Sequence, residues 1–168
     1  MHVLLTGDRN AGKTTVVETT VSRLRQRGVT PVGFYTAGGP ERLELVAAET
    51  GERVPFGTQA DDADGIEVGR YTIDPAAIER GLALARRDGD VLVADEIGRL
   101  ERRGGGFAPL LDDLRPDRFR GVLVSVRKGL TGFVADAFPD EQSPEIIEVT
   151  PSNRSALPDR VVEQLLGP

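Results

Sequence analysis

Residues 7–14 read Gly-Asp-Arg-Asn-Ala-Gly-Lys-Thr, which matches the spacing G-x-x-x-x-G-K-[ST]. With this spacing, successive backbone N–H groups converge on phosphate oxygens, the lysine reaches the outer phosphates and the hydroxyl binds Mg²⁺. We therefore expect Lys13 to be catalytic and Thr14 to be a metal ligand. The loop residues expected to contact a nucleotide are Gly7, Asp8, Arg9, Asn10, Ala11, Gly12, Lys13, Thr14 and Thr15. The alternative is a plain glycine turn with a surface lysine.

An acidic pair, Asp95-Glu96, follows the apolar run 91–94. A carboxylate at the end of a buried strand can hold the shell of a magnesium ion, and a second acid beside it can activate water as a general base. We expect Asp95 to complete the metal site and Glu96 to be the catalytic base, because neighbouring strand residues point in opposite directions. An ion pair between Glu96 and an arginine such as Arg99 is the alternative.

Several other residue types limit the chemistry. The chain has no cysteine and one histidine, His2, so a thiolate nucleophile, a cysteine-bound zinc and a histidine triad are excluded. The guanine-reading pattern N-K-x-D is absent, since the corresponding strand end reads Ser-Val-Arg-Lys at 125–128. Arg127 either places a cation near the terminal phosphate or lies in a solvated turn. The acidic cluster Asp61, Asp62 and Asp64 lacks the spacing of a calcium loop and indicates a solvated loop.

The hydrophobic pattern indicates which elements carry these residues. Strands are expected at 2–6, 30–36, 91–95, 121–126 and 146–149, a hairpin at 42–57, and a loop at 58–70. Helices are expected from Lys13 to Gly28, from Asp74-Pro75 to Gly89, at 107–114, weakly at 130–137, and at 157–166. Strand and helix alternate, which predicts a three-layer α/β P-loop fold. Its mainly parallel sheet has helices on both faces and a β-hairpin insertion near 42–57, and a ligand binds at the carboxyl ends of the strands.

Composition restricts the partners. The 168 residues suit a single domain, 1–168, and the net charge of −6 disfavours nucleic-acid binding, which depends on Lys and Arg neutralising phosphates. No apolar run approaches the length of a membrane span, and no basic-then-apolar start suggests a signal peptide. We expect a cytoplasmic monomer whose partner is a nucleoside triphosphate.

Five segments together resemble the thermostable nucleoside-triphosphatase family of P-loop proteins. They are GDRNAGKTT at 7–15, VGFYT at 32–36, VGRY at 68–71, DEIG at 95–98 and TPSNR at 150–154. The resemblance implies Mg²⁺-dependent hydrolysis of ATP, GTP and other nucleoside triphosphates with loose base preference. It also implies that Asn153 and Arg154 lie against the base, although Asn153 could instead cap a helix. The chain departs from the family after Thr36, where an acidic residue and an arginine are usual, and after Glu101.

Two other functions remain open at this stage. One is a small phosphotransferase in which the segment 37–70 holds an acceptor. The arginine-rich lid expected of such enzymes is missing, because the segment 127–140 carries only Arg127 and Lys128. The other is a non-enzymatic adaptor whose conformation depends on the nucleotide.

Overall fold

The computed structural model describes residues 1–59, 64–112 and 114–167. Its strands form one sheet in the order β5-β6-β4-β3-β2-β7-β8-β1-β9. The strands are β1 (His2–Thr6), β2 (Pro31–Gly38), β3 (Arg42–Ala47), β4 (Arg53–Thr58), β5 (Ile66–Val68), β6 (Tyr71–Ile73), β7 (Val91–Ile97), β8 (Gly121–Val126) and β9 (Glu145–Glu148). The α-helices are α1 (Lys13–Gln26), α2 (Pro75–Ala85), α3 (Arg99–Arg102), α4 (Ala108–Asp112), α5 (Thr131–Ala135) and α6 (Leu157–Leu166), with short 3₁₀ turns at Pro116–Arg118 and Asp140–Gln142.

The sheet has a parallel half and an antiparallel half. Strands β2, β7, β8, β1 and β9 pair in parallel, whereas β2, β3, β4, β6 and β5 pair antiparallel. Strands therefore follow one another without a helix from β2 to β6: β3 and β4 lie in the segment 42–57 expected to be a hairpin, whereas β5 and β6 add strands that break the expected alternation of strand and helix. The parallel half carries the predicted motifs, and their strands β1 and β7 end at the same edge.

Part of the segment 58–70, expected to be a loop, is a strand. Ile66–Val68 pairs with Tyr71–Ile73 through a tight turn at Gly69 and Arg70, where Gly69 has a φ of 62°. Ile66 and Val68 pack against the hydrophobic core, and this contact outweighs the polar composition of the segment. Of the acidic cluster, Asp61 and Asp62 lie outside the described residues.

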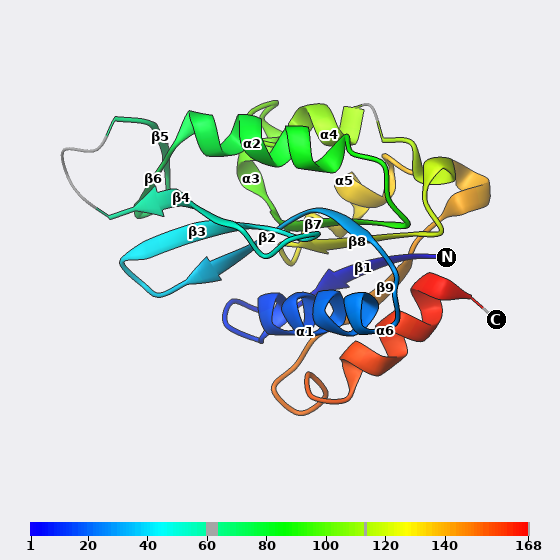
Figure 1. Ribbon diagram of the computed structural model, residues 1–168. Helices are drawn as coiled ribbons and strands as arrows, with labels where there is room; N and C mark the ends of the chain where they lie inside the picture. The colour runs from blue at the N-terminus through cyan, green and yellow to red at the C-terminus, as the bar shows by residue number, and fades with distance from the viewer. Residues whose placement is uncertain (60–63, 113, 168) are drawn as a thin grey trace.

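Helices cover both faces of the sheet (Figure 1): α1 and α6 lie below it, and α2, α3, α4 and α5 lie above it in that view. The alternation of side chains along each parallel strand explains this arrangement. Val3 and Leu5 of β1 pack with α1 and α6, whereas Leu4 belongs to the core on the other side. In β7, Val91 and Val93 belong to the core cluster on the side of α1 and α6, and Leu92 and Ala94 belong to the cluster on the other side of the sheet. Hydrophobic side chains pack on both faces of the parallel half of the sheet, so polar side chains that could bind a ligand are expected at the ends of these strands.

None of the helices in the described ranges is both long enough and apolar enough to span a membrane.

Candidate phosphate and metal site

The loop between β1 and α1 has the backbone of a phosphate cradle. Gly7 has a φ of 147°, and a Cβ at this position would lie 2.5 Å from the carbonyl oxygen of Val149, so no larger residue fits. Gly12 begins α1 from a left-handed conformation with a φ of 106°. Asn10 also has a positive φ, 61°. These conformations turn the chain sharply from the end of the strand into the first turn of α1, where unpaired N–H groups and the helix dipole favour an anion.

Lys13 lies over this loop. Its Nζ donates to the carbonyl oxygens of Gly7 and Asp8 at 3.0 and 3.1 Å, so the ammonium group sits at the mouth of the cradle. The Asp8 carboxylate points away to Lys128, with Oδ1 and Nζ 3.1 Å apart, and Lys128 also pairs with Glu148. Of the loop, Asp8 and Arg9 are exposed and Ala11 is buried. Thr15, next to Thr14 on α1, is also exposed.

The first contact between the two predicted motifs is a hydrogen bond from Thr14 to Asp95. Thr14 Oγ1 donates to Asp95 Oδ2 at 2.9 Å, although 81 positions separate the two residues. Asp95 is fully buried. The structure thus brings together Lys13, Thr14 and Asp95 at one edge of the sheet.

Sequence reasoning did not assign a role to two residues that surround Asp95. Thr36, in β2, donates to Asp95 Oδ2 through its backbone N–H at 3.1 Å and its hydroxyl at 3.0 Å. Ser125, in β8, donates its hydroxyl to Asp95 Oδ1. Because β2 and β8 flank β7, a hydroxyl residue near the end of each strand is the sequence signal that could have indicated this cluster.

Glu96 leaves the regular strand. Its φ is 65°, and the register between β7 and β8 shifts between Ala94 and Ile97. Asp95 points inward and Glu96 is exposed, as the prediction required, but the left-handed backbone of Glu96 and not simple strand alternation produces this division. Within the described ranges, no ion pair joins Glu96 to Arg99, the alternative partner considered from the sequence.

The carboxyl group of Glu96 is electrostatically unusual. Although its side chain reaches the surface, protein atoms displace much of the water around the carboxylate, and this desolvation raises its pKa to about 7, with a further increase from the charge of Asp95. The cations Lys13, Arg127 and Arg9 oppose this rise in the pKa. The charges of the glycine loop and of Asp95 therefore both act on the Glu96 carboxylate, and Arg127 adds positive charge beside it.

The turn after β9 reaches the cradle through Arg154. A Cβ at Gly12 would lie 2.7 Å from Arg154 Cδ, so the arginine side chain packs directly on the glycine loop. The side-chain amide of Asn153 is occupied inside the turn: Oδ1 accepts from the N–H of Thr150 at 2.8 Å, and Nδ2 donates to the carbonyl oxygen of Glu148 at 2.9 Å. Asn153 thus shapes the turn, and Arg154 is the residue of the pair that lies beside the loop.

The oxygen atoms of Thr14 and Asp95 fit a small hard cation such as Mg²⁺. The proton of the Thr14 hydroxyl is directed to Asp95, which leaves the lone pairs of Oγ1 for a metal ion. In the described ranges, no group of three or more His, Cys, Asp or Glu residues could hold a metal by itself. This sparse donor set is typical of Mg²⁺ sites, where phosphates and waters supply most ligands.

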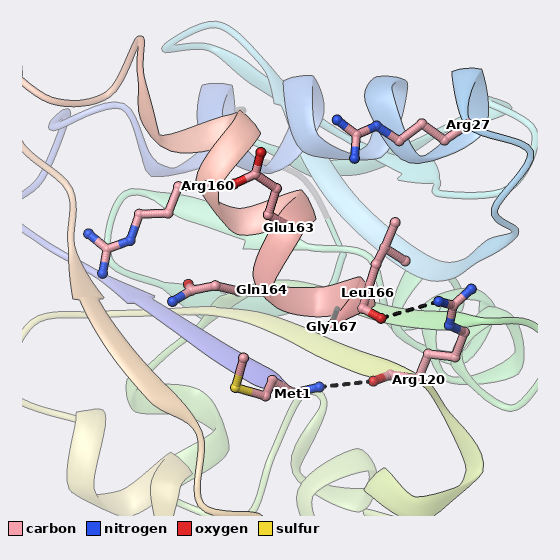
Figure 2. Close-up of a pocket in the computed structure, with 8 residues that line it drawn as sticks. All are labelled: Met1, Arg27, Arg120, Arg160, Glu163, Gln164, Leu166 and Gly167. Carbon is pink, nitrogen blue, oxygen red and sulfur yellow. Dashed lines mark hydrogen bonds between the residues drawn. The ribbon is translucent and has the colours of Figure 1, made fainter.

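A separate concavity lies at the opposite edge of the sheet, beside the start of β1. It encloses about 740 Å³ and is lined by Met1, Arg27, Arg120, Arg160, Glu163, Gln164, Leu166 and Gly167 (Figure 2). Two of its arginines bind the protein itself: Arg120 donates to the Leu166 carbonyl at the end of α6, and Arg160 pairs with Glu145. None of the residues of the phosphate cradle or the acidic pair lines this concavity, and we assign it no part in the site.

Comparisons with known proteins show similarity over nearly the whole chain. Residues 2–162 match the family described as NTPase. The nucleoside-triphosphatase THEP1 of Caldivirga maquilingensis is 30% identical, covering 97% of this chain and 94% of that protein. THEP1 of Natranaerobius thermophilus is also 30% identical, covering 98% and 96%. The crystal structure of THEP1 from Aquifex aeolicus, 24% identical, aligns with a TM-score of 0.75 over 98% of this chain and 99% of that chain, so the two share a fold.

Proposed function

The chain belongs to the NTPase family, and we propose that it hydrolyses nucleoside triphosphates to the diphosphate and phosphate, using Mg²⁺ and with little preference for the base. One observation carries this proposal: the hydrogen bond from Thr14 to Asp95, which joins the glycine loop to the acidic pair. A triphosphate seated on the loop would have its terminal phosphate near this junction. We further propose that the enzyme is a monomer built on one domain.

Phosphate binding falls to the loop and to Lys13. The ammonium group, now on the carbonyl oxygens of Gly7 and Asp8, would exchange these partners for β- and γ-phosphate oxygens. Thr14 and Asp95 would hold Mg²⁺, Thr14 directly and Asp95 through the hydroxyl it orients. When bound, Mg²⁺ neutralises charge on the β- and γ-phosphates.

Glu96 would act as the general base. Its carboxylate is exposed beside the buried Asp95, where it can accept a proton from the attacking water while Lys13 and the loop amides stabilise charge on the phosphoryl group. The new bond forms between the water oxygen and the γ-phosphorus, the bond to the bridging oxygen breaks, and the proton of the water passes to Glu96.

Loose base preference is supported by the two residues of the turn after β9. Asn153 uses its amide within the turn, so it is not available to read the edge of a base. Arg154 offers a guanidinium plane beside Gly12, and such a plane can stack on any base without distinguishing its edge.

The proposal is tested by hydrolysis of ATP, GTP, CTP and UTP with and without Mg²⁺, and by the same assay on Glu96→Gln and Lys13→Ala. We expect all four nucleotides to be hydrolysed, only with Mg²⁺. Glu96→Gln should lower kcat by about 10² to 10⁴, the usual contribution of a positioned base, with nucleotide affinity nearly unchanged. Lys13→Ala should weaken both nucleotide affinity and turnover, because Lys13 would contact the phosphates in the bound substrate and in the transition state.

Glu79→Gln, the same change on the exposed face of α2, serves as the control and should keep full activity. Wild-type turnover by Glu96→Gln would remove Glu96 from this role. A panel of nucleosides and nucleotides added as acceptors tests the phosphotransferase alternative, which would be preferred if phosphate transfer proved faster than hydrolysis.

A further inference from the structure

We propose that Ser125 is a positioning residue for hydrolysis: its hydroxyl holds the Asp95-Glu96 segment so that Glu96 presents its carboxylate to the attacking water. This inference rests on the proposed function. Ser125 is fully buried in β8, between the strand that precedes the glycine loop and the strand that carries the acidic pair.

The Ser125 hydroxyl contacts both members of the pair. It donates to Asp95 Oδ1, and it accepts a hydrogen bond from the backbone N–H of Glu96 at 3.0 Å. Asp95 has further donors, Thr14 and Thr36, but all of them bind the other carboxylate oxygen, Oδ2. Ser125 is therefore the residue seen to satisfy Oδ1 in the described part of the chain, and also the one seen to hold the amide of Glu96.

The contact to Glu96 matters because its backbone is strained. A left-handed conformation is sterically unfavourable for a non-glycine residue, and it persists only where surrounding contacts impose it. In the described ranges, the non-glycine residues with a positive φ are Asn10 and Glu96, and both lie at the site. Around Glu96, the Ser125 hydroxyl holds the N–H before the bend, and the N–H of Arg127 donates to the carbonyl oxygen of Ile97 at 3.0 Å after it.

Loss of the hydroxyl would act on turnover more than on nucleotide binding. The backbone N–H groups and the Lys13 ammonium group that would bind phosphate lie in the loop 7–14, whereas the hydrogen bonds of the Ser125 hydroxyl in the described ranges go to Asp95 and Glu96. Asp95 keeps the three bonds to Oδ2, so the Thr14 hydroxyl stays oriented. Glu96, in contrast, loses the partner of its N–H, and a base displaced by about 1 Å can lose 10² in rate.

The test is a double-mutant cycle between Ser125→Ala and Glu96→Gln, with nucleotide affinity measured by binding of a non-hydrolysable triphosphate and Mg²⁺. We expect Ser125→Ala to lower kcat about 10- to 100-fold in the wild-type background. In the Glu96→Gln background, where no base remains to be positioned, the same change should alter kcat by less than about threefold. Affinity should change little in either background.

Two further variants separate positioning from folding. Ser125→Thr keeps the hydroxyl and should recover much of the lost rate. Thr20→Val removes a fully buried hydroxyl of α1 that has no hydrogen-bond partner among the described residues, and it should leave kcat unchanged. Thermal denaturation of each variant establishes that it is folded. The inference is overturned if Ser125→Ala keeps wild-type turnover, or if it lowers kcat by the same factor in both backgrounds. A wild-type protein without hydrolytic activity would instead overturn the proposed function, and this inference with it.

Discussion

At the scale of single residues, the site depends on an unfavourable backbone conformation at Glu96. The register between β7 and β8 shifts at this point, and Asp95 points into the core while Glu96 points outward. In a regular strand, the two neighbouring side chains would simply lie on opposite faces of the sheet. The strain at a φ of 65° is located at the residue proposed as the general base, a common arrangement in active sites.

This conformation predicts an unusual order of stability among substitutions of Glu96. Glu96→Gly should have a higher free energy of unfolding than Glu96→Ala, by about 0.5 to 1 kcal/mol, because glycine adopts a positive φ without steric cost. In an ordinary strand the order would be reversed. Chemical denaturation of both variants measures the difference. The control position is Glu67, a residue of the regular strand β5 that does not have a positive φ. There, Glu67→Ala should have a higher free energy of unfolding than Glu67→Gly. Equal order at both positions would contradict the strained backbone.

Residue spacing was sufficient to predict part of this site. The match at 7–14 and the acidic pair after 91–94 predicted Lys13, Thr14 and Asp95 as candidate site residues, and the structure brings these three together. Thr36 and Ser125 were missed because their contacts to Asp95 depend on which strands are neighbours in the sheet, a property that no local pattern contains. The role of Asn153 within its turn was likewise invisible until the partners of its amide were known.

At the scale of elements, the parallel strands could be predicted and the antiparallel ones only in part. Continuous apolar runs such as 91–94 and 121–124 indicate strands buried on both faces, and these became β7 and β8. The short strand β5 carries only three residues, which is too few for an alternating pattern to be distinguished from a loop. Its existence depends on pairing with β6, a contact that forms only in the folded sheet.

The contact between β2 and β7 sets the distance from Thr36 to Asp95, and Gly33 permits that contact. Gly33 has a φ of 92°, and a Cβ there would lie 2.1 Å from the carbonyl oxygen of Val93. Gly33→Ala should therefore lower the free energy of unfolding by more than about 2 kcal/mol, since backbone strain and overpacking act together. Denaturant unfolding measures the loss. Gly39→Ala, at a position with open space and no positive φ, should be nearly neutral, and an equal loss at both positions would contradict this account.

At the scale of the whole molecule, the two edges of the parallel half have different roles. The carboxyl ends of β1 and β7 bring the loop and the acidic pair together, whereas the start of β1 lies beside the concavity at the end of α6. Figure 1 shows both chain termini on the side away from the loop that precedes α1. The size of the concavity alone would suggest a ligand site, but Arg120 and Arg160 in its lining already have protein partners.

Substitution of Arg120 tests this division between the edges. Arg120 donates to the carbonyl oxygen of Leu166, where a cation also compensates the negative end of the α6 dipole. Arg120→Ala should lower the free energy of unfolding by about 0.5 to 1 kcal/mol, the usual value of such a contact, and should leave both kcat and KM for nucleoside triphosphates unchanged. Denaturation and steady-state hydrolysis measured on the same preparation provide both values. A contact that only stabilises the end of α6 cannot affect a ligand at the opposite edge of the sheet. A change in KM without a change in stability would therefore show that the concavity takes part in binding nucleotide.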